Sequence, residues 1–241
     1  MHATEFEFRN RWWVIFGVFF AAFGAYNIDH VNSAQAIVEW LARRAGTPAT
    51  DNQLRLIFAF GALLLVLAAF LRTWGTSYLQ ADVMRDRRVH TERLLADGPY
   101  RYVRNPLYLG NIFMAVGLGL MASRTGLLIL SLGMNIVVVR LLLREEFELL
   151  RDQGEPYRRY CAAVPRLVPA LFPRVPSAGD APRWGQGIRA ELMYWIMALA
   201  MAVFAATLKI AFFWGLFAVA LAMAFLYKRP VTKADPPPAA S

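Results

Sequence analysis

Long apolar runs separated by short arginine-rich stretches form the main pattern of this chain. A helix that crosses a membrane needs about 20 predominantly apolar residues. Six runs reach or approach that length, at residues 11–26, 54–71, 106–122, 127–143, 192–208 and 210–227. We expect each run to cross a bilayer as a helix, although the first is a little short. The pattern predicts an all-α, polytopic helical membrane protein with about six transmembrane helices.

Two further segments have helical periodicity without the length of a span. In residues 33–44, apolar side chains recur at helical spacing on one face, which predicts an amphipathic helix on the membrane surface. The helix at 127–143 is predicted to extend out of the membrane, because its apolar stripe continues until Gly154 can end it. A short helix is expected next, with Tyr157 and Tyr160 on one face.

Composition agrees with a membrane protein, since 58% of the residues are hydrophobic and the mean hydropathy is +0.38. The net charge of +9 would suggest a nucleic-acid partner in a soluble protein. Here the basic residues lie between apolar runs, so we expect no nucleic acid. They concentrate in loops predicted to share one side, mainly residues 85–104 and 144–189. The positive-inside rule therefore predicts that these loops and both termini are cytoplasmic.

Several kinds of site are not expected from the sequence. Cys161 is the only cysteine, and His2, His30 and His90 are scattered along the chain. This predicts neither a disulfide nor a metal site. The N-terminus carries no small-residue cleavage site, so no cleavable signal peptide is expected.

The chain divides into four predicted parts. Residues 1–72 hold the first transmembrane segments and the surface helix. Residues 73–176 hold a core formed by the central helical hairpin, the polar turn before it and the acidic extension of its second helix. Residues 177–229 form a second transmembrane hairpin, predicted to be structural because it is less polar than the first. Residues 230–241 contain three consecutive prolines and are predicted to be disordered.

Residues 98–110, G-P-Y-R-Y-V-R-N-P-L-Y-L-G, concentrate tyrosine and arginine at the start of an apolar run. We call this stretch the central turn. Asn105 suits a helix N-cap and Pro106 suits the first helical position, so a helix is expected to begin here. One interpretation is a belt of interfacial side chains that anchors the helix end. The other is a functional site held at the membrane surface.

The central turn resembles the R-H-P/R-N-P signature of the isoprenylcysteine carboxyl methyltransferase and phospholipid N-methyltransferase superfamily. The resemblance resumes at Glu145-Glu146 and at G-E-P-Y-R-R-Y, residues 154–160, and covers roughly residues 74–169. Members of this superfamily are integral membrane enzymes that use S-adenosylmethionine. The resemblance implies methyl transfer to a lipidic or small hydrophobic acceptor, such as a prenylated carboxylate, a phospholipid amine, an isoprenoid or a thiol. The positive-inside rule places the central turn and Glu145-Glu146, and with them the expected cofactor pocket, on the cytoplasmic side.

Nine residues are candidates for this site. Arg104 and Arg140 are expected to be catalytic and to act on the acceptor, because a guanidinium suits an anionic head group. By the resemblance, Arg140 lies where the carboxyl methyltransferases carry a catalytic arginine. Cofactor binding is expected from the motif residues, the acidic pair and neighbouring tyrosines, namely Tyr100, Asn105, Tyr108, Glu145, Glu146, Tyr157 and Tyr160. Carboxylates suit the ammonium or ribose of the cofactor, and aromatic rings suit its sulfonium or adenine.

Simpler interpretations stand beside several of these assignments. Arg140 lies about one turn from the end of its span and can extend its charge to the membrane surface. The pair Glu145-Glu146 can be a solvated acidic turn. Gly75 matches weakly a cofactor-contacting glycine turn of the phospholipid methyltransferases, but helix packing through a small residue explains it at least as well. Asn105 replaces the histidine of the carboxyl methyltransferases, so histidine-dependent proton transfer is not expected.

Two other functions are compatible with the sequence. Membrane sterol reductases share a helical architecture but use NADPH, which needs a second basic and aromatic groove that the sequence does not reveal. A non-enzymatic membrane protein can use the arginines of the central turn to bind anionic lipids.

Overall fold

The computed structural model describes residues 2–79 and 97–227, and within them the regular elements are helices. The four arginines of the polar segment 81–96 and the tail 230–241 lie outside the described residues. The helices are α1 (Glu5–Arg9), α2 (Arg11–Gly24), α3 (Ser33–Ala45), α4 (Asp51–Tyr78), α6 (Pro106–Gly119), α7 (Arg124–Gln153), α8 (Glu155–Ala163), α9 (Trp184–Ala190), α10 (Leu192–Thr207) and α11 (Ile210–Tyr227). Two short 3-10 turns, η1 (Ala25–Asn27) and η2 (Gly98–Arg101), complete them. The predicted all-α fold is confirmed.

Each predicted apolar run is a helix, but only some of these helices are long enough to cross a membrane alone. α4 and α7 pass the requirement for length and apolarity. α9 and α10 together give a third candidate span, bent by 64° at the break between them. α6 and the segment Ile210–Val219 of α11 are apolar but shorter. The fold therefore has two or three candidate spans by this measure, and six transmembrane helices stay a prediction.

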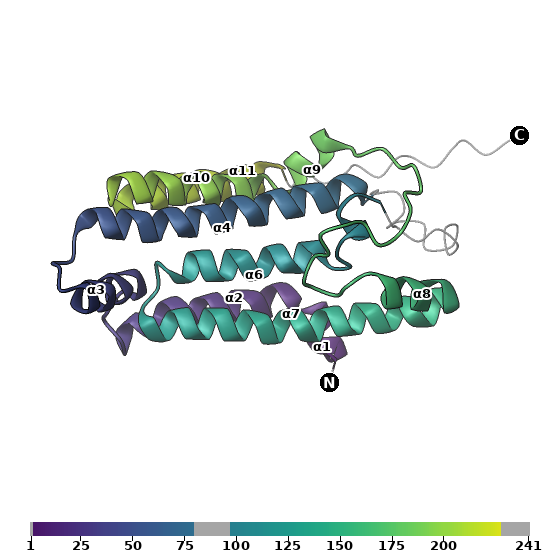
Figure 1. Ribbon diagram of the computed structural model, residues 1–241, viewed down its shortest axis with the longest axis horizontal. Helices are drawn as coiled ribbons and strands as arrows, with labels where there is room; N and C mark the ends of the chain where they lie inside the picture. Colours follow the sequence, from purple (N-terminus) through teal and green to yellow (C-terminus); the bar gives the residue numbers. More distant parts are fainter. Residues whose placement is uncertain (1, 80–96, 228–241) are drawn as a thin grey trace, which may run out of the picture.

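The long helices run side by side, with α6 between α4 and α7 (Figure 1). α10 packs between α4 and α11, and α2 packs on α7. α3 lies across one end of this bundle, and α8 and α9 lie at the other end (Figure 1). Elements that are far apart in the sequence thus meet along α4, and the predicted boundary after residue 72 falls inside this continuous helix.

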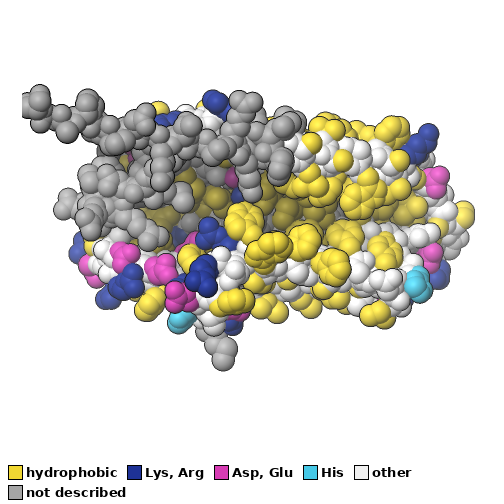
Figure 2. Space-filling view, turned by 180° about the vertical axis from the view of Figure 1, so that it is seen from behind, with side chains coloured by type: hydrophobic (Ala, Val, Ile, Leu, Met, Phe, Trp, Pro, Cys, Tyr) yellow, Lys and Arg dark blue, Asp and Glu magenta, His cyan; other side chains and the backbone are white. Residues whose placement is uncertain are grey.

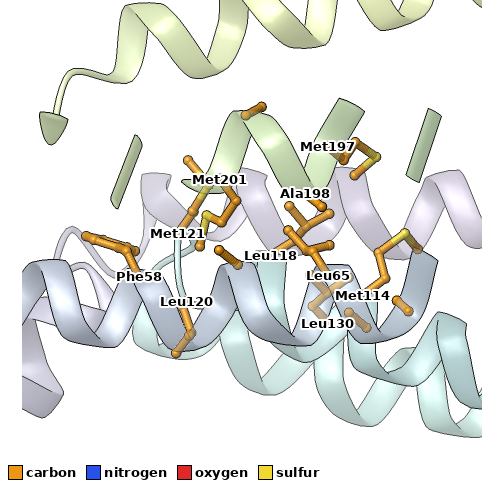
Figure 3. Packing of buried hydrophobic residues seen from close by; sticks show 14 of the residues in the cluster. Phe58, Leu65, Met114, Leu118, Leu120, Met121, Leu130, Met197, Ala198 and Met201 are labelled. Carbon is orange, nitrogen blue, oxygen red and sulfur yellow. The ribbon is translucent and has the colours of Figure 1, made fainter. Parts of the chain in front are cut away.

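The core forms where α4, α6, α7 and α10 converge (Figure 3). Leu65, Leu130, Met134 and Met201 are among its fully buried side chains. α4 and α6 approach closely through glycine, since a Cβ on Gly117 would lie 2.9 Å from a backbone oxygen of α4. Such a contact through a small residue is typical of helices that pack closely in a membrane.

The outer surface of the bundle is apolar between two charged ends. Hydrophobic side chains cover much of one face, while arginine, lysine and carboxylates gather toward its two ends (Figure 2). Exposed large apolar residues include Trp13, Phe20, Leu56, Leu132 and Ile136, from three different helices. An apolar surface of this extent would be costly in water and suits a lipid environment. Together with the long apolar helices, it indicates an integral membrane protein.

α7 is a single helix that carries the chain from the apolar core to the charged end of the bundle. Its 30 residues begin at a cap in which the Ser123 hydroxyl accepts from the Gly126 N–H at 3.1 Å. It ends at Gly154, whose φ of 60° is costly for residues with a side chain. The predicted continuation of this helix beyond residue 143 and its end at Gly154 are therefore confirmed. This extension brings the acidic pair to the charged end.

Candidate active site

A cavity of about 410 Å³ lies between the central turn, α4, α7, α8 and the start of α10. Its volume falls within the usual range of ligand-binding pockets, about 300–1,000 Å³. Eight of the nine predicted site residues line it, namely Tyr100, Arg104, Asn105, Tyr108, Glu145, Glu146, Tyr157 and Tyr160. The ninth, Arg140, does not. The two separate motifs thus meet at one cavity.

The central turn is held rigidly by the chain that follows α8. The Arg104 N–H donates to the carbonyl of Pro165, and the Ala170 N–H donates to the carbonyl of Tyr102, both at 2.9 Å. Tyr160 on α8 donates its hydroxyl to the Tyr100 carbonyl at 2.8 Å. Backbone N–H and C=O groups of the central turn therefore form hydrogen bonds with α8 and with the segment that follows it, and these bonds lie outside regular secondary structure. This accounts for a stable irregular segment beside the cavity.

Asp97 anchors the start of the turn to the same part of the chain. Its carboxylate accepts hydrogen bonds from the Ser177 hydroxyl and from the backbone N–H groups of Ala178 and Asp180. Burial raises the pKa of Asp97, but these hydrogen bonds outweigh it and hold the pKa below the usual value. Asp97 therefore stays ionised at neutral pH and keeps residues 177–180 against the turn.

Glu146 is a structural centre of the site. Its Oε1 accepts from Asn105 Nδ2 at 3.0 Å and lies 3.5 Å from Arg104 Nη1. Its Oε2 accepts from Arg166 Nε at 3.0 Å. Because Glu146 is only 8% exposed and both its oxygens are engaged, it ties the central turn to α7 and to the segment after α8.

Asn105 occupies the predicted N-cap position of α6, but its side chain does not cap the helix. The side-chain amide donates to Glu146 and to the Arg166 carbonyl instead. A carboxylate is a stronger acceptor partner for an amide N–H than a neutral group, so the contact with Glu146 takes precedence. Pro106 does take the first helical position, as predicted.

Glu145 and Tyr108 face the cavity from neighbouring helices. The Glu145 carboxylate interacts with the Tyr108 hydroxyl, and neither residue is fully buried. Glu145 has no ion pair within the described residues, in contrast to Glu146. The acidic pair is thus divided, as adjacent helical residues require, and Glu145 is the member free to meet a ligand.

The tyrosines of the cavity are neutral hydrogen-bonding and stacking groups. Burial raises the pKa of Tyr100 and of Tyr160 above the ordinary value for a phenol. Tyr157 and Tyr160 are both buried on α8, with ring centroids 5.9 Å apart, which confirms that they share a face. Their rings offer aromatic surface to a cationic or planar ligand.

Arg104 and a residue absent from the predictions, Gln153, have unpaired polar atoms at the cavity. Arg104 Nε and Gln153 Oε1 are buried and have no hydrogen-bond partner among the described residues. An unsatisfied buried group costs about 1–3 kcal/mol. One of these atoms is a donor and the other an acceptor, so a ligand with both kinds of group would satisfy them.

Arg140 lies outside the cavity, against the N-terminal helix. Its Nη2 is 2.7 Å from the Glu7 carboxylate of α1, and its backbone carbonyl accepts from the Ala3 N–H at 2.9 Å. The arginine is therefore neither a cavity residue nor a free charge at the membrane surface. Its catalytic role stays a prediction.

The site contains further residues that the motifs did not reveal. Arg72 from α4, Asn111 from α6 and Tyr194 from α10 line the cavity together. Arg72 forms a buried ion pair with Glu191, with Nε 2.7 Å from Oε2. Both charges flank apolar runs in the sequence, which is the signal that could have identified them. Gly75 packs within α4 against Leu107, so helix packing accounts for it.

One family model matches the chain, that of the phospholipid methyltransferases, over residues 56–152. No curated protein and no solved structure shows significant similarity. The matched segment holds Tyr100, Arg104, Asn105, Tyr108 and the acidic pair, and it ends before α8. The predicted superfamily is confirmed over this segment, because residues 56–152 match the model of the phospholipid methyltransferases.

Proposed function

We propose that this protein is an integral membrane methyltransferase that transfers a methyl group from S-adenosylmethionine to a lipidic or small hydrophobic acceptor. The observation that carries this proposal is the cavity itself. Side chains from both predicted motifs line it, although about 40 residues separate them in the chain. The family match supports methyl transfer in a membrane, in preference to an NADPH-dependent reductase or a lipid-binding protein without activity.

The residues at the cavity fit S-adenosylmethionine. The Glu145 carboxylate and the unpaired Gln153 oxygen are acceptors for an ammonium group or for ribose hydroxyls. Tyr100, Tyr157 and Tyr160 supply aromatic surface for a sulfonium or an adenine ring. When bound, the cofactor supplies a methyl group that its sulfonium has already activated. The protein is left to align the two reactants and to exclude water.

Arg104 is the residue we propose to act on the acceptor. Its side chain is 9% exposed, and its Nη1 is shared with Glu146 while its Nε faces no partner. A guanidinium held in this way can bind a carboxylate or phosphate and fix its orientation. Asn105 stabilises this arrangement through Glu146 and takes no part as a base.

The proposal includes the position of the site relative to the membrane. We propose about six membrane passes, with both termini and the cavity on the cytoplasmic side. The C-terminal end of α11 and the helix α1 both lie at the end of the bundle that carries α8 (Figure 1). Termini at the same end of the bundle support an even number of membrane passes.

Calorimetric titration of the purified protein in nanodiscs tests the activity class. We expect S-adenosylhomocysteine to bind and NADPH not to bind. Incubation with methyl-labelled S-adenosylmethionine and a membrane lipid extract, followed by mass spectrometry, would identify the acceptor. Binding of NADPH alone would favour the reductase, and binding of neither would favour a non-enzymatic role.

A further inference from the structure

A network of four polar side chains forms one wall of the cavity beyond the predicted motifs. Arg72 donates from Nε and Nη2 to Glu191, at 2.7 and 3.1 Å. Its Nη1 donates to Asn111 Oδ1 at 2.8 Å. The Tyr194 hydroxyl donates to the same oxygen, also at 2.8 Å. Arg72, Asn111 and Tyr194 face the cavity, and Glu191 is 3% exposed and lies behind them.

The network fixes the orientation of the Asn111 amide. Arginine has only donors, so the atom that faces Arg72 must be the amide oxygen. The amide nitrogen then points away from the network. It has no hydrogen-bond partner in the described part of the chain, although Asn111 is 9% exposed and lines the cavity. This nitrogen is not among the fully buried unpaired atoms, so it is open to the cavity, where a ligand can accept a hydrogen bond from it.

The charges of the network select the kind of group that can bind there. Glu191 compensates the charge of Arg72 through two hydrogen bonds. A carboxylate or phosphate would therefore be opposed by Glu191, and an ammonium by Arg72. The neighbouring cavity residues Met114 and Leu141 are apolar. An uncharged polar group on an apolar molecule is the best match.

The hydrogen-bonding groups of Asn111 and Tyr194 indicate which uncharged polar group fits this wall of the cavity. Asn111 offers two N–H donors, whereas Tyr194 has given its only hydrogen to Asn111 and can now only accept. A hydroxyl satisfies both, because its oxygen accepts from the amide and its hydrogen can be donated to the phenol oxygen. A carbonyl oxygen would use only the amide.

We propose that Asn111 and Tyr194 form a subsite for an uncharged hydroxyl of an apolar acceptor, with Arg72 and Glu191 as positioning residues. The identification of this ligand as the acceptor rests on the proposed function, but binding of an alcohol does not. The subsite holds a part of the acceptor distinct from the anionic group assigned to Arg104. Tyr194 and Glu191 lie outside the family segment, so the C-terminal hairpin contributes to the site and is not only structural.

The test uses three probes that share one chain and differ in charge: 1-dodecanol, dodecanoate and dodecylammonium. Each is titrated calorimetrically into the protein in nanodiscs, with and without saturating S-adenosylhomocysteine. Because Arg104 and Glu145 in the same cavity can hold the two charged probes, we compare the affinity of each variant with that of the wild type for each probe. Asn111→Leu should bind 1-dodecanol roughly five- to ten-fold more weakly, as the loss of one neutral hydrogen bond requires. Asn111→Asp places an extra negative charge beside Arg72 and should bind dodecylammonium more tightly than the wild type does.

Thr73→Val is the matched control. It removes another hydrogen bond between α10 and α4, from Trp195 Nε1 to the Thr73 hydroxyl at 2.9 Å, whose residues do not line the cavity. Its affinity for 1-dodecanol should equal that of the wild type. If Asn111→Leu does not fold, Tyr194→Phe serves in its place and should also weaken binding of the alcohol.

Two results would overturn the subsite: unchanged affinity of Asn111→Leu for 1-dodecanol, or an equal loss of that affinity in Thr73→Val and Asn111→Leu. Failure of the proposed function is seen separately. In that case S-adenosylhomocysteine does not bind the wild type, while the titrations of alcohol without it still report on the subsite.

Discussion

At the scale of single residues, the structure gives different roles to the two adjacent glutamates. We expect Glu145→Gln to weaken binding of S-adenosylhomocysteine about ten- to a hundred-fold, the loss of a charge-assisted hydrogen bond of about 1.5–3 kcal/mol. Its thermal stability should change little, because Glu145 has no ion pair in the described residues. Calorimetry and thermal unfolding in the same detergent measure the two effects.

Glu146→Gln should have the opposite profile. It leaves the buried guanidinium of Arg104 without its partner, and breaking a buried pair from one side costs about 3–5 kcal/mol. The midpoint of thermal unfolding should therefore fall well below that of Glu145→Gln. If Glu146→Gln is as stable as the wild type and loses only cofactor affinity, the division of roles is wrong.

Arg104 gives a second prediction at this scale. Arg104→Lys should retain affinity for S-adenosylhomocysteine and lower turnover at least about ten-fold, because an ammonium cannot bind a carboxylate or phosphate with two parallel hydrogen bonds. Single-turnover kinetics and calorimetry separate the two quantities. A large loss of cofactor affinity with unchanged acceptor binding would assign Arg104 to the cofactor.

The sequence was most informative about residues inside motifs. Eight predicted residues line one cavity because motif spacing reflects a shared site even when the intervening helices are long. The sequence was least informative about which side chains form hydrogen bonds or ion pairs with one another. Nothing in the local pattern of Asn105 indicates that its amide would bond Glu146, 41 positions away, and not cap its own helix. Likewise, the contact of Arg140 with Glu7 joins residues 133 positions apart.

At the scale of elements, apolar periodicity located most of the long helices to within a few residues, although α4 continues seven residues beyond the run predicted at 54–71. α10 was predicted at 192–208 and spans Leu192–Thr207, and α3 was predicted at 33–44 and spans Ser33–Ala45. The helices α1 and α9 were not predicted, since they have five and seven residues and too few positions to show a period. α9 nevertheless contributes to the site, because it ends next to Glu191 in the cavity wall. α1 contacts α7 through the ion pair of Glu7 with Arg140.

The docking of α1 on α7 leads to a prediction about this element. The hydrogen bond from Arg140 is the main reason why the pKa of Glu7 is lowered to about 2 from its usual 4.5. Because this pKa is lower in the docked state, docking is favoured above pH 4.5 and is lost as the pH falls toward 2. Glu7→Gln should therefore release α1 at neutral pH.

Hydrogen exchange of the N-terminal peptide measures this release. The Ala3 N–H, which donates to the Arg140 carbonyl, should lose its protection in Glu7→Gln. Glu5→Gln is the matched control, because Glu5 lies on the same helix and forms no ion pair within the described residues. Unchanged protection in Glu7→Gln would show that the ion pair does not hold α1.

At the scale of the whole molecule, tertiary contacts assign a role that the sequence did not predict. The C-terminal hairpin was expected to be structural, yet α10 packs along α4 and brings Tyr194 to the cavity. This contact joins segments more than 100 residues apart, and no single-sequence pattern specifies such a pairing. The apolar periodicity defines which helices exist, whereas their side-chain contacts decide which of them complete the site.

The last prediction concerns the orientation of the whole bundle in the membrane. Helices of 14 residues, such as α2 and α6, extend only about 21 Å, which is less than a hydrocarbon core of about 30 Å. α6 still runs alongside the longer α4 and α7, and α2 runs alongside α7 (Figure 1). We therefore expect each of the six apolar helices to count as one membrane pass, with flanking turns completing the short ones.

Reporter fusions test this orientation directly. A fusion after Ser241 should report the cytoplasm, because arginines concentrate at the end of the bundle that carries the cavity. A reporter inserted between Thr47 and Thr50, in the connection from α3 to α4, should report the opposite side. External reporters at both positions would mean an odd number of passes, and α2 or α6 would then be the first helix to reconsider, because each is too short to span the membrane alone. An external C-terminal reporter with a cytoplasmic one at residues 47–50 would mean that the orientation is inverted.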